Sequence, residues 1–577
     1  MNPEPKLIST EKELCRMCYT CIRDCPAKAI RVLEGQAEVM EDRCIGCGNC
    51  VMVCSQKAKR VVSSTGELME LLSSGRKVAA LVAPSFPAEF SDTTPGQLVR
   101  SLRAMGFSIV AEVAFGADLV AAEYRRLFGH SSGERHIAST CPAVVTFIEK
   151  HHPQLVRYLA PIVSPMIASA RAMRKLHGED LATVFIGPCI AKKTEARNAG
   201  IPDLVITFGE LRTLLEDVPE VALAGENGQF DLPEPGLGSL FPVSRGMLQS
   251  ANLHEDILSG RIISVDGKNS LVDVIKEFSD GTLDARLLEI LCCHGCIMGP
   301  GMSVNSSLFS RRTAIRFYAN RHVSEMNRKE EFLIRRQLLG LNLKIAFSQR
   351  GISRHRPSDS QLSEILKRLG KSRPEDELNC GACGYATCRE HAIAIYEGLA
   401  EREMCLPYTI ERLHSSLVSL RESNQELKNT KEALLNSEKL ASMGQLSAGI
   451  AHEVNNPLGV ILLYANLLLE ESEPGSGLHD ELRVITEQAE RCKKIVSGLL
   501  NFARRNKVIP QSVHMDEFIA KCMRAVVIPD NVEVKIENTL GSTILEVDPD
   551  QMTQVITNLV VNSVEAMPRG GLLVINT

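Results

Sequence analysis

The 577-residue sequence lacks any run of about 18 uninterrupted apolar residues, the length that a membrane-spanning helix needs. Its first residues, MNPEPKLISTEKEL, lack the basic segment followed by an apolar one that marks a secretory signal. Strong charge of either sign is also missing, because the formal net charge is -5, and this gives no electrostatic basis for binding nucleic acid or anionic lipid. We therefore expect a cytoplasmic protein with no membrane insertion and no nucleic-acid partner.

Cysteine, by contrast, is abundant. The chain has 19 cysteines, and without an export signal they cannot form a disulfide framework, because the cytosol keeps thiols reduced. Eight lie before Ser55, five between Cys141 and Cys296, and four between Cys380 and Cys405, leaving only Cys492 and Cys522. Clustered thiolates favour iron or zinc. At roughly 150 residues per domain, the length predicts about four domains.

Two N-terminal segments carry the same cysteine spacing. Residues 15–26 are CRMCYTCIRDCP and residues 44–54 are CIGCGNCVMVC, and each contains CxxCxxCxxxC, the run of bacterial ferredoxins. In that run three close thiolates hold one [4Fe-4S] cluster and the fourth serves the other cluster. Zinc is the alternative, but zinc sites seldom use this triple spacing. The spacing predicts an electron wire or a redox sensor with two ligand sets: Cys15, Cys18, Cys21 and Cys54, and Cys44, Cys47, Cys50 and Cys25.

The middle of the chain, from about Ser64 to Ser348, alternates strand-like runs with helical stretches. Strand-like runs are VAALVAPS, SIVAEVAF, ATVFIGPC and RIISVDG, and PGQLVRSLRAMGF is helical in pattern. This alternation predicts an α/β domain. The segments STCPAVV, GPCIAKKTE and LCCHGCIMGPG bring further cysteines. Their spacing leaves open whether four of them converge on a cubane: Cys141, Cys189, Cys292 and Cys296.

These three segments, in this order and behind a two-cluster ferredoxin, resemble the signature segments of the catalytic domain of [FeFe]-hydrogenases, over roughly residues 64–345. The resemblance implies that Cys141, Cys189 and Cys292 bind a [4Fe-4S] cubane. It also implies that Cys296 bridges to a two-iron subcluster, which in the family carries CO, cyanide and a dithiolate. Lys192, with Glu195 in the family's PCxxKxxE pattern, is then expected to donate to a cyanide. Three glycines are expected to let the backbone approach the metal: Gly295, Gly299 and Gly301.

The sequence also departs from catalytic members of that family. Thr140 stands where they carry a proton-relaying Cys, and a hydroxyl has too high a pKa to relay protons like a thiol. Gly187 stands where they carry Met, and Leu288 and Ile290 where they carry Glu and Met. We expect these changes to retune or disable turnover without abolishing the cubane. Two further neighbours of the site are expected not to be ligands: Cys293, as a buried thiol, and His294.

A third kind of iron site is predicted from NCGACGYATC and the later MC at residues 404–405. The stretch up to CLPY resembles the small Fe-S domain of electron-transfer complexes and fused regulatory proteins. Zinc is again the alternative. The glycine-rich start leaves backbone N–H groups free to point at sulfides. The predicted ligands are Cys380, Cys383, Cys388 and Cys405.

After Pro407 the chain contains a heptad pattern. Leucines recur every seven residues, at Leu413, Leu420, Leu427 and Leu434, and no Gly or Pro interrupts them. This predicts a short parallel coiled coil, in which Asn424 at the seam fixes the register. A solvated single helix is the alternative.

The residues HEVNNPL at 452–458 match the phosphoacceptor box of histidine kinases. His452 lies just off an apolar stripe of Leu446, Ile450 and Val454, where an exposed imidazole can attack a phosphoryl group. The resemblance implies that Glu453 accepts the imidazole proton, that Asn456 contacts the phosphoryl group and that Pro457 bends the helix. The alternative for a lone His on such a helix is a surface residue without a role.

A second helix, LHDELRVITEQAERCKKIVSGLLNFAR, carries apolar residues at spacings of three or four, with Cys492 among them as a core residue. Two such hairpins from two chains form a four-helix bundle, so a homodimer is expected.

From Gln511 an α/β segment follows, and its NLVVNSVEA resembles the box that binds magnesium and ATP in these kinases. That resemblance makes Asn562 the Mg²⁺ ligand, with Asn558 in support. Because the chain stops at Thr577 inside LLVINT, we expect the ATP-binding domain to be incomplete.

The predicted fold class is therefore multidomain, α/β and α+β. The predicted function is a redox- or hydrogen-responsive sensor histidine kinase of a two-component system, which phosphorylates His452 from ATP and passes the phosphoryl group to a response regulator. A catalytic [FeFe]-hydrogenase and an iron-sulfur electron-transfer protein are the alternatives, and ferredoxin or another redox partner would supply electrons.

The predicted domains are a two-cluster ferredoxin domain at 1–62, a hydrogenase-like domain at 63–348, a small [4Fe-4S] domain at 349–408, a signalling coiled coil at 409–440, a dimerisation and phosphoacceptor domain at 441–508 and a partial ATP-binding domain at 509–577.

Overall fold

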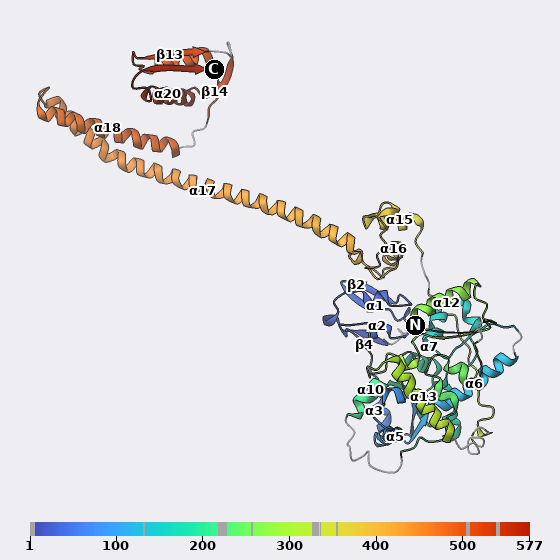
Figure 1. Cartoon of the computed structure of the whole chain (residues 1–577). Coiled ribbons are helices and arrows are strands. Elements are labelled where there is room, and N and C mark those ends of the chain that lie inside the picture. The colour runs from blue at the N-terminus through green and yellow to red at the C-terminus, as the bar shows by residue number, and fades with distance from the viewer. Residues whose placement is uncertain are drawn as a thin grey trace. The chain divides into compact units, whose positions relative to one another are not determined.

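The computed structural model forms two compact units, Met1–His414 and Ser415–Thr577 (Figure 1). It mixes helices with small sheets, as an α/β and α+β chain should. The structure describes residues 6–130, 133–216, 228–255, 258–325, 334, 336–352, 356–503, 508–537 and 543–576.

The N-terminal part of the first unit consists of two antiparallel strand pairs and two one-turn helices. β1 (Ile8–Thr10) pairs with β4 (Lys59–Val61), and β2 (Ile30–Leu33) pairs with β3 (Gln36–Val39). The helices α1 (Thr20–Arg23) and α2 (Asn49–Met52) each follow a residue in the left-handed conformation, Tyr19 and Gly48. Each helix therefore starts inside a cysteine run, where a tight turn brings neighbouring thiols to one side.

A four-stranded parallel sheet forms the centre of the following α/β region. Its strand order is β6-β5-β8-β9, and every residue of β5 and β8 is buried, as expected for a parallel sheet that is covered on both faces. The strands are β5 (Val78–Val82), β6 (Ile109–Glu112), β8 (Ala182–Gly187) and β9 (Leu204–Thr207). The helices joined to them are α3 (Thr65–Ser73), α4 (Phe86–Glu89), α5 (Pro95–Ala104), α6 (Val113–His130), α8 (Pro165–His177), α9 (Ala191–Ala199) and α10 (Phe208–Leu215).

One boundary in this sheet differs from the sequence pattern. The apolar run SIVAEVAF is strand-like throughout, but β6 ends at Glu112 and α6 begins at Val113. A short buried apolar run fits a strand and the first turn of a buried helix equally well, so periodicity could not place this boundary. The tight change from strand to helix places Val113 at the carboxyl end of the sheet, where the cavity described below lies.

A second sheet has three parallel strands in the order β10-β11-β7. They are β7 (His136–Ile137), β10 (Ile262–Asp266) and β11 (Leu287–Leu291), and α7 (Pro142–His151) and α12 (Lys268–Asp280) accompany them. β11 has the sequence LLEIL and is buried along its whole length. It leads directly into the cysteine segment that begins at Cys292.

The first unit is completed by α11 (Gly246–Ser250), α13 (Leu308–Glu325), α15 (Asp359–Arg368) and α16 (Cys388–Tyr396). α15 starts at a capping box, in which the side chains of Ser358 and Gln361 each bond to the other residue's backbone N–H. α15 and α16 pack on each other through Leu362, Leu366 and Ala392. They form the body of the predicted small Fe-S domain.

The 66-residue helix α17 (Leu406–Glu471) begins directly after Cys405, and α18 (Gly477–Ala503) follows it. The strand pairs β12–β14 and β13–β15 and two helices make up the C-terminal α/β part. Their bounds are β12 (Gln511–His514), α19 (Met515–Arg524), β13 (Val532–Glu537), β14 (Ile544–Val547), α20 (Pro549–Glu565) and β15 (Gly571–Asn576). Within the described residues, no helix combines the length and the apolar character needed to cross a membrane.

Candidate metal centres and phosphoacceptor site

The structure brings the ferredoxin cysteines together in the two crossed sets expected from their spacing. Burial raises the pKa of the Cys21 thiol, and the nearby thiols of Cys15, Cys18 and Cys54 raise it further. Cys50 is likewise surrounded by the second set, since burial and the thiols of Cys47, Cys25 and Cys44 all raise its pKa. The fourth cysteine of each run thus lies with the first three of the other run.

The thiols are crowded in a way that suits a positively charged iron cluster. Burial and the neighbouring Cys47 raise the pKa of Cys25 to about 11, and burial raises that of Cys44 to about 12. Thiolates are the form that binds metal, and here they repel one another and have lost their hydration. Iron would supply the compensating charge, so these residues fit [4Fe-4S] clusters. Within the described residues, no three His, Cys, Asp or Glu side chains are arranged to hold a single metal ion.

A second group of thiols lies in the α/β region. Cys141 is the residue before α7, and its sulfur accepts the backbone N–H groups of Ala143, Val144 and Cys292. Cys189 follows β8, and burial together with the thiols of Cys141 and Cys296 raises its pKa to about 12. Three segments that are distant in the sequence therefore deliver their thiols to one place, at the carboxyl ends of parallel strands.

Cys292 lies between this group and the ferredoxin. Its thiol lies beside the thiol of Cys47, and this interaction lowers the pKa of Cys47 and, together with burial, raises that of Cys292. Cys292 also donates its backbone N–H to Cys141. It packs in one hydrophobic cluster with Cys25, Cys44, Cys47, Cys141 and Cys189.

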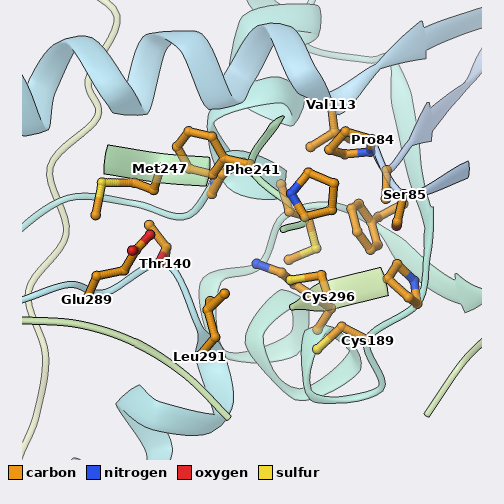
Figure 2. A pocket seen from close by; sticks show the side chains of 17 residues that line it. Pro84, Ser85, Val113, Thr140, Cys189, Phe241, Met247, Glu289, Leu291 and Cys296 are labelled. Carbon is orange, nitrogen blue, oxygen red and sulfur yellow. The ribbon is translucent and has the colours of Figure 1, made fainter. Parts of the chain in front are cut away.

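A cavity of about 70 Å³ lies beside Cys189 and Cys296 (Figure 2). Its walls are mostly apolar, with Val113, Phe241 and Met247 among them. Four polar side chains also line it: Ser85, Thr140, Lys192 and Glu289. Such a mostly apolar cavity with a few convergent polar groups is typical of a ligand site.

Two hydroxyl groups in this cavity have no hydrogen-bond partner, Ser85 Oγ and Thr140 Oγ1. A buried hydroxyl without a partner costs about 1–3 kcal/mol, so their positions favour a polar ligand in the cavity. A two-iron group with diatomic ligands would offer acceptors to them and would take Cys296 as its thiolate. The residues present therefore fit such a group.

Lys192 and Glu195 form an ion pair of 2.7 Å between Nζ and Oε2 inside this region. The two side chains are only 10% and 16% exposed, so the pair is largely shielded from water. Lys192 lines the cavity and lies near Cys141, Cys189 and Cys296. Its ammonium is thus held by Glu195 at the edge of the thiol group.

The structure explains why Gly187 departs from the catalytic pattern. It also shows a further cavity residue, Glu289, which the sequence pattern did not indicate. A Cβ atom at Gly187 would lie 2.7 Å from the ring of Phe185, so this ring occupies the space that a larger side chain would need. Leu288 and Ile290 pack in the hydrophobic cluster behind β11, whereas the strand alternation turns Glu289 into the cavity.

Glu289 is only 1% exposed, and burial raises its pKa to about 7. Ser264 Oγ donates to its Oε2 over 2.6 Å, and the Met247 backbone N–H donates to the carboxylate as well. A carboxyl group with such a pKa can gain or lose a proton near neutral pH. The sequence feature that could have identified Glu289 is its position as a single acidic residue in the centre of the apolar run LLEIL.

The glycines of the third cysteine segment are required by neighbouring backbone. A Cβ at Gly299 would lie 2.5 Å from the Pro188 carbonyl oxygen, and one at Gly301 would lie 2.9 Å from it. Gly295 has φ +78°, and its Cβ would lie 2.8 Å from the Pro242 carbonyl oxygen. These glycines therefore let two chain segments approach each other closely, while their expected role beside the metal stays a prediction.

The other two residues of this segment occupy different surroundings. Cys293 is half-buried, and burial and the thiols of Cys189, Cys141 and Cys296 raise its pKa. His294 is 65% exposed and lies 3.1 Å from Asp266 through Nδ1. His294 therefore points away from the thiols and toward the surface.

In the small domain, Cys383 lies near the thiols of Cys405 and Cys380, and burial followed by these thiols raises its pKa. Cys405 is buried, and Cys380 is exposed. Cys388 is the first residue of α16, and Asn379 Oδ1 accepts its backbone N–H over 2.8 Å. Three of the four predicted ligands thus come together, while the fourth is held in place by the loop that carries Cys380.

In the second unit, His452, Glu453 and Asn456 are exposed on α17, and Pro457 lies inside this helix. Ala451 beside His452 is fully buried. An exposed imidazole next to a buried position has the access that phosphoryl transfer requires. Cys492 is exposed in the single chain, so its predicted place in the core of a two-chain bundle is not tested.

Asn558 and Asn562 are exposed one helical turn apart on α20. Asp548 caps this helix by accepting the backbone N–H groups of Asp550 and Gln551. Both asparagines are thus open to a ligand.

Four family models match successive parts of the chain. They are described as 4Fe-4S dicluster domain at residues 7–55, iron only hydrogenase large subunit, C-terminal domain at 76–300, putative Fe-S cluster at 376–407, and His Kinase A (phospho-acceptor) domain at 442–507. The chain joins iron-sulfur and hydrogenase-like domains to a histidine kinase phosphoacceptor domain.

Curated relatives match a limited part of this multidomain chain. It is 31% identical over 147 residues to the sensor histidine kinase ZraS of Salmonella typhi, covering 25% of this chain and 32% of that protein. It is 31% identical over 172 residues to sporulation kinase A of Bacillus subtilis, covering 29% and 28%. The sensor kinase CckA of Brucella abortus is 30% identical over 154 residues, covering 26% and 16%. The chain thus spans about a third or less of the length of these relatives.

Among solved structures, the chain is similar to [FeFe]-hydrogenases. An apo [FeFe]-hydrogenase HydA1 from Chlamydomonas reinhardtii matches with a TM-score of 0.41 and 21% identity, covering 50% of this chain and 100% of that one. A structure of an oxygen-inactivated [FeFe]-hydrogenase matches with a TM-score of 0.39 and 20% identity, with the same coverage.

Proposed function

We propose that the protein is a redox- or hydrogen-responsive sensor histidine kinase of a two-component system. The observation that carries this proposal is the exposed His452 within the phosphoacceptor domain at residues 442–507 of a chain that also has iron-sulfur and hydrogenase-like domains. Clusters change charge when they gain an electron, and this change is the input to the kinase.

Thiolates of the front part would hold four [4Fe-4S] clusters, and each cluster, when bound, supplies reversible storage of one electron. The crowding of the buried thiols supports this assignment. The ligands are Cys15, Cys18, Cys21 and Cys54; Cys25, Cys44, Cys47 and Cys50; Cys141, Cys189, Cys292 and Cys296; and Cys380, Cys383, Cys388 and Cys405.

The cavity beside Cys296 would hold a two-iron subcluster. Ser85 and Thr140 would donate hydrogen bonds to it from their unpartnered hydroxyls, and Lys192 would contribute its positive charge. Glu289, which also lines the cavity, would hold a proton beside this group. Since Thr140 cannot relay protons as a thiol does, this site serves sensing better than rapid turnover.

His452 would attack the γ-phosphoryl group of ATP through its imidazole nitrogen while the bond to the leaving ADP breaks. Glu453 would accept the imidazole proton, and Asn456 would orient the phosphoryl group. Asn562, with Asn558 beside it, would bind the Mg²⁺ that bridges the nucleotide phosphates. An Asp of a response regulator would then receive the phosphoryl group.

The heptad leucines of α17 support a homodimer. Leu413, Leu420, Leu427 and Leu434 are each between 58% and 67% exposed in the single chain. An apolar seam of this kind is covered when two helices form a coiled coil.

The test incubates the full-length protein with radioactive ATP and Mg²⁺. We expect label on the wild type and none on His452→Gln. His414→Gln is the matched control, because His414 is an exposed histidine on the same helix. Equal labelling of His452→Gln and the wild type would contradict the proposal.

A working hydrogenase is the second candidate, and the protonatable Glu289 beside the thiols favours it. Its test is hydrogen turnover by the matured protein with an artificial electron carrier. Rates comparable to those of a dedicated hydrogenase would place this function first.

A further inference from the structure

The predicted small Fe-S domain shares a hydrophobic core with the ferredoxin part. Ile22, Ile30 and Val32 of the ferredoxin pack in one buried cluster with Tyr385, Leu399 and Met404 of the small domain. The Val32 backbone N–H donates to the Leu399 carbonyl oxygen over 2.9 Å, and the Glu34 N–H donates to Glu401 Oε1 over 2.8 Å. The two parts are thus fixed to each other by core packing and by backbone hydrogen bonds.

An ion pair between Arg43 and Glu397 lies within this contact. Arg43 Nη1 and Glu397 Oε2 are 3.0 Å apart, and their side chains are only 10% and 12% exposed. The Arg43 carbonyl oxygen also lies 2.9 Å from His151 Nε2 of α7. A charge pair with so little water around it holds its partners firmly, since removing one charge leaves the other buried and unpaired.

Lys28 makes a second link, between the two groups of thiols. Its Nζ donates to the carbonyl oxygens of Ile22 and Arg23 in the ferredoxin, and to that of Gly384 over 3.1 Å. Gly384 has φ +91°, and a Cβ there would lie 3.1 Å from Ile22 Cγ2, so only glycine allows this approach. One ammonium group therefore lies between the loop of Cys25 and the loop of Cys383.

The other end of the small domain is the start of α17. Cys405 is buried, and its carbonyl oxygen accepts the Thr409 backbone N–H of the first helical turn over 2.9 Å. Glu403 is tied to the same turn, because Thr409 Oγ1 donates to its carbonyl oxygen and Arg412 pairs with its carboxylate at 2.7 Å. A predicted iron ligand is thus the residue that immediately precedes the helix that carries His452.

We propose that this contact, fixed by Arg43–Glu397 and by Lys28, is the output coupling of the sensor: electrons reach the small domain through the ferredoxin and change the start of α17 through Cys405. The proposal rests on the proposed function, in that both sets of thiols hold iron clusters. The electron step is balanced, because a ferredoxin cluster loses one electron as the small-domain cluster gains one, and no bond breaks. A low-potential one-electron donor supplies the electron.

The positive charge of Lys28 acts on the clusters proposed on either side of it. A cluster that gains an electron becomes more negative, and a nearby cation stabilises this reduced form. Lys28 is a positioning residue, because it acts on clusters held by other side chains and touches no reacting atom. Its removal therefore shifts the reduction of the small-domain cluster to lower potential.

The test is made on the full chain, reconstituted with iron and sulfide under anaerobic conditions. Redox titration followed by electron paramagnetic resonance measures cluster potentials, and hydrogen-deuterium exchange measures residues 406–414 in the oxidised and reduced forms. In the wild type we expect exchange in this segment to differ between the two forms. In Arg43→Gln and Glu397→Gln we expect that difference to be lost, and in Lys28→Gln a shift of the small-domain potential to a lower value.

Two controls separate the coupling from misfolding. Arg31→Gln removes a similar ferredoxin ion pair, Arg31–Glu38 at 3.0 Å, but one whose side chains are 40% and 38% exposed, so it should keep the wild-type response. The exchanged pair Arg43→Glu with Glu397→Arg restores opposite charges and should recover part of the response. The coupling would be overturned if Arg31→Gln lost the redox-dependent difference in exchange of residues 406–414, or if Arg43→Gln kept that difference unchanged.

The outcome is distinguishable from failure of the proposed function. Absence of iron from the small domain would remove the cluster assignment itself, and with it the coupling. Iron at all sites with no redox difference in residues 406–414 would overturn the coupling alone. A redox difference without labelling of His452 would support the coupling and contradict the kinase.

Discussion

The thiol of Cys47 lies beside the thiol of Cys292, although one belongs to the ferredoxin run and the other to the third cysteine segment of the α/β region. Both pack in the same buried cluster. If each binds the cluster proposed for it, the two clusters are neighbours through these two cysteines. Electrons would then pass between ferredoxin and hydrogenase-like domain without an intervening carrier.

The assignment of Cys292 as a cubane ligand predicts the effect of its removal. Cys292→Ala should lose one cubane, so that iron falls from about sixteen to about twelve atoms per chain. Cys293→Ala is the matched control beside it and should keep its iron. Iron analysis of the anaerobically reconstituted full chain checks this, and an equal loss from Cys293→Ala would show that the neighbouring thiol is the ligand.

Glu289 predicts a pH dependence of stability. Burial raises its pKa from the ordinary value of 4.5 to about 7, so the folded chain binds this proton more tightly than the unfolded chain does. The resulting stability is fully present below pH 4.5 and is lost as the pH rises through about 7. The full difference amounts to about 3 kcal/mol.

Glu289→Gln should remove this component, so that the free energy of unfolding falls less steeply across this pH range than in the wild type. Urea unfolding at a series of pH values measures it. Glu277→Gln on α12 is the control, because that residue is exposed, and its pH profile should match the wild type. Parallel profiles for Glu289→Gln and the wild type would contradict the prediction.

The unpartnered hydroxyl of Thr140 predicts a substitution that stabilises the metal-free chain. Thr140→Val removes a buried donor without a partner and should raise the free energy of unfolding by about 1 kcal/mol. In the matured protein the gain should disappear, because the hydroxyl then has an acceptor.

Ser139→Ala is the matched comparison for Thr140→Val. Ser139 Oγ donates to the Ile162 carbonyl oxygen over 2.7 Å and lies 3.0 Å from the Tyr124 hydroxyl. Its removal should destabilise the chain by about 1–3 kcal/mol. Thermal unfolding of both variants gives the comparison, and destabilisation by Thr140→Val in the metal-free chain would refute the account of the cavity.

Gly48 predicts a strict requirement for glycine between the ferredoxin and the α/β region. It has φ +69°, and a Cβ there would clash with the Pro300 ring. Gly48→Ala should therefore cost about 1–3 kcal/mol of stability through overpacking, in addition to backbone strain. Gly66→Ala on α3 meets no atom within 4 Å and should stabilise the helix by about 0.5–1 kcal/mol. Chemical denaturation of both variants distinguishes the expected loss of stability in Gly48→Ala from the expected gain in Gly66→Ala.

Much of the fold was accessible from local patterns. The alternation of apolar runs identified the strands β5, β8 and β10, and the heptads and apolar stripes identified the helices α17 and α18. The boundary after Glu112 was not accessible, because a buried helix start and a buried strand show the same apolar residues. Glu289 was missed for a similar reason: a single acidic residue in an apolar strand does not show which face it occupies.

The sequence by itself determined which residues are candidates to bind metal or to accept a phosphoryl group. Cysteine spacing within a run, and the residues around His452, are local because a ligand loop or one helical turn spans only a few residues. The tertiary structure decided which distant groups meet: Cys47 with Cys292, Glu289 with the cavity, and Arg43 with Glu397. The physical reason is that such contacts depend on how whole sheets and loops pack, and no short stretch of residues encodes that packing.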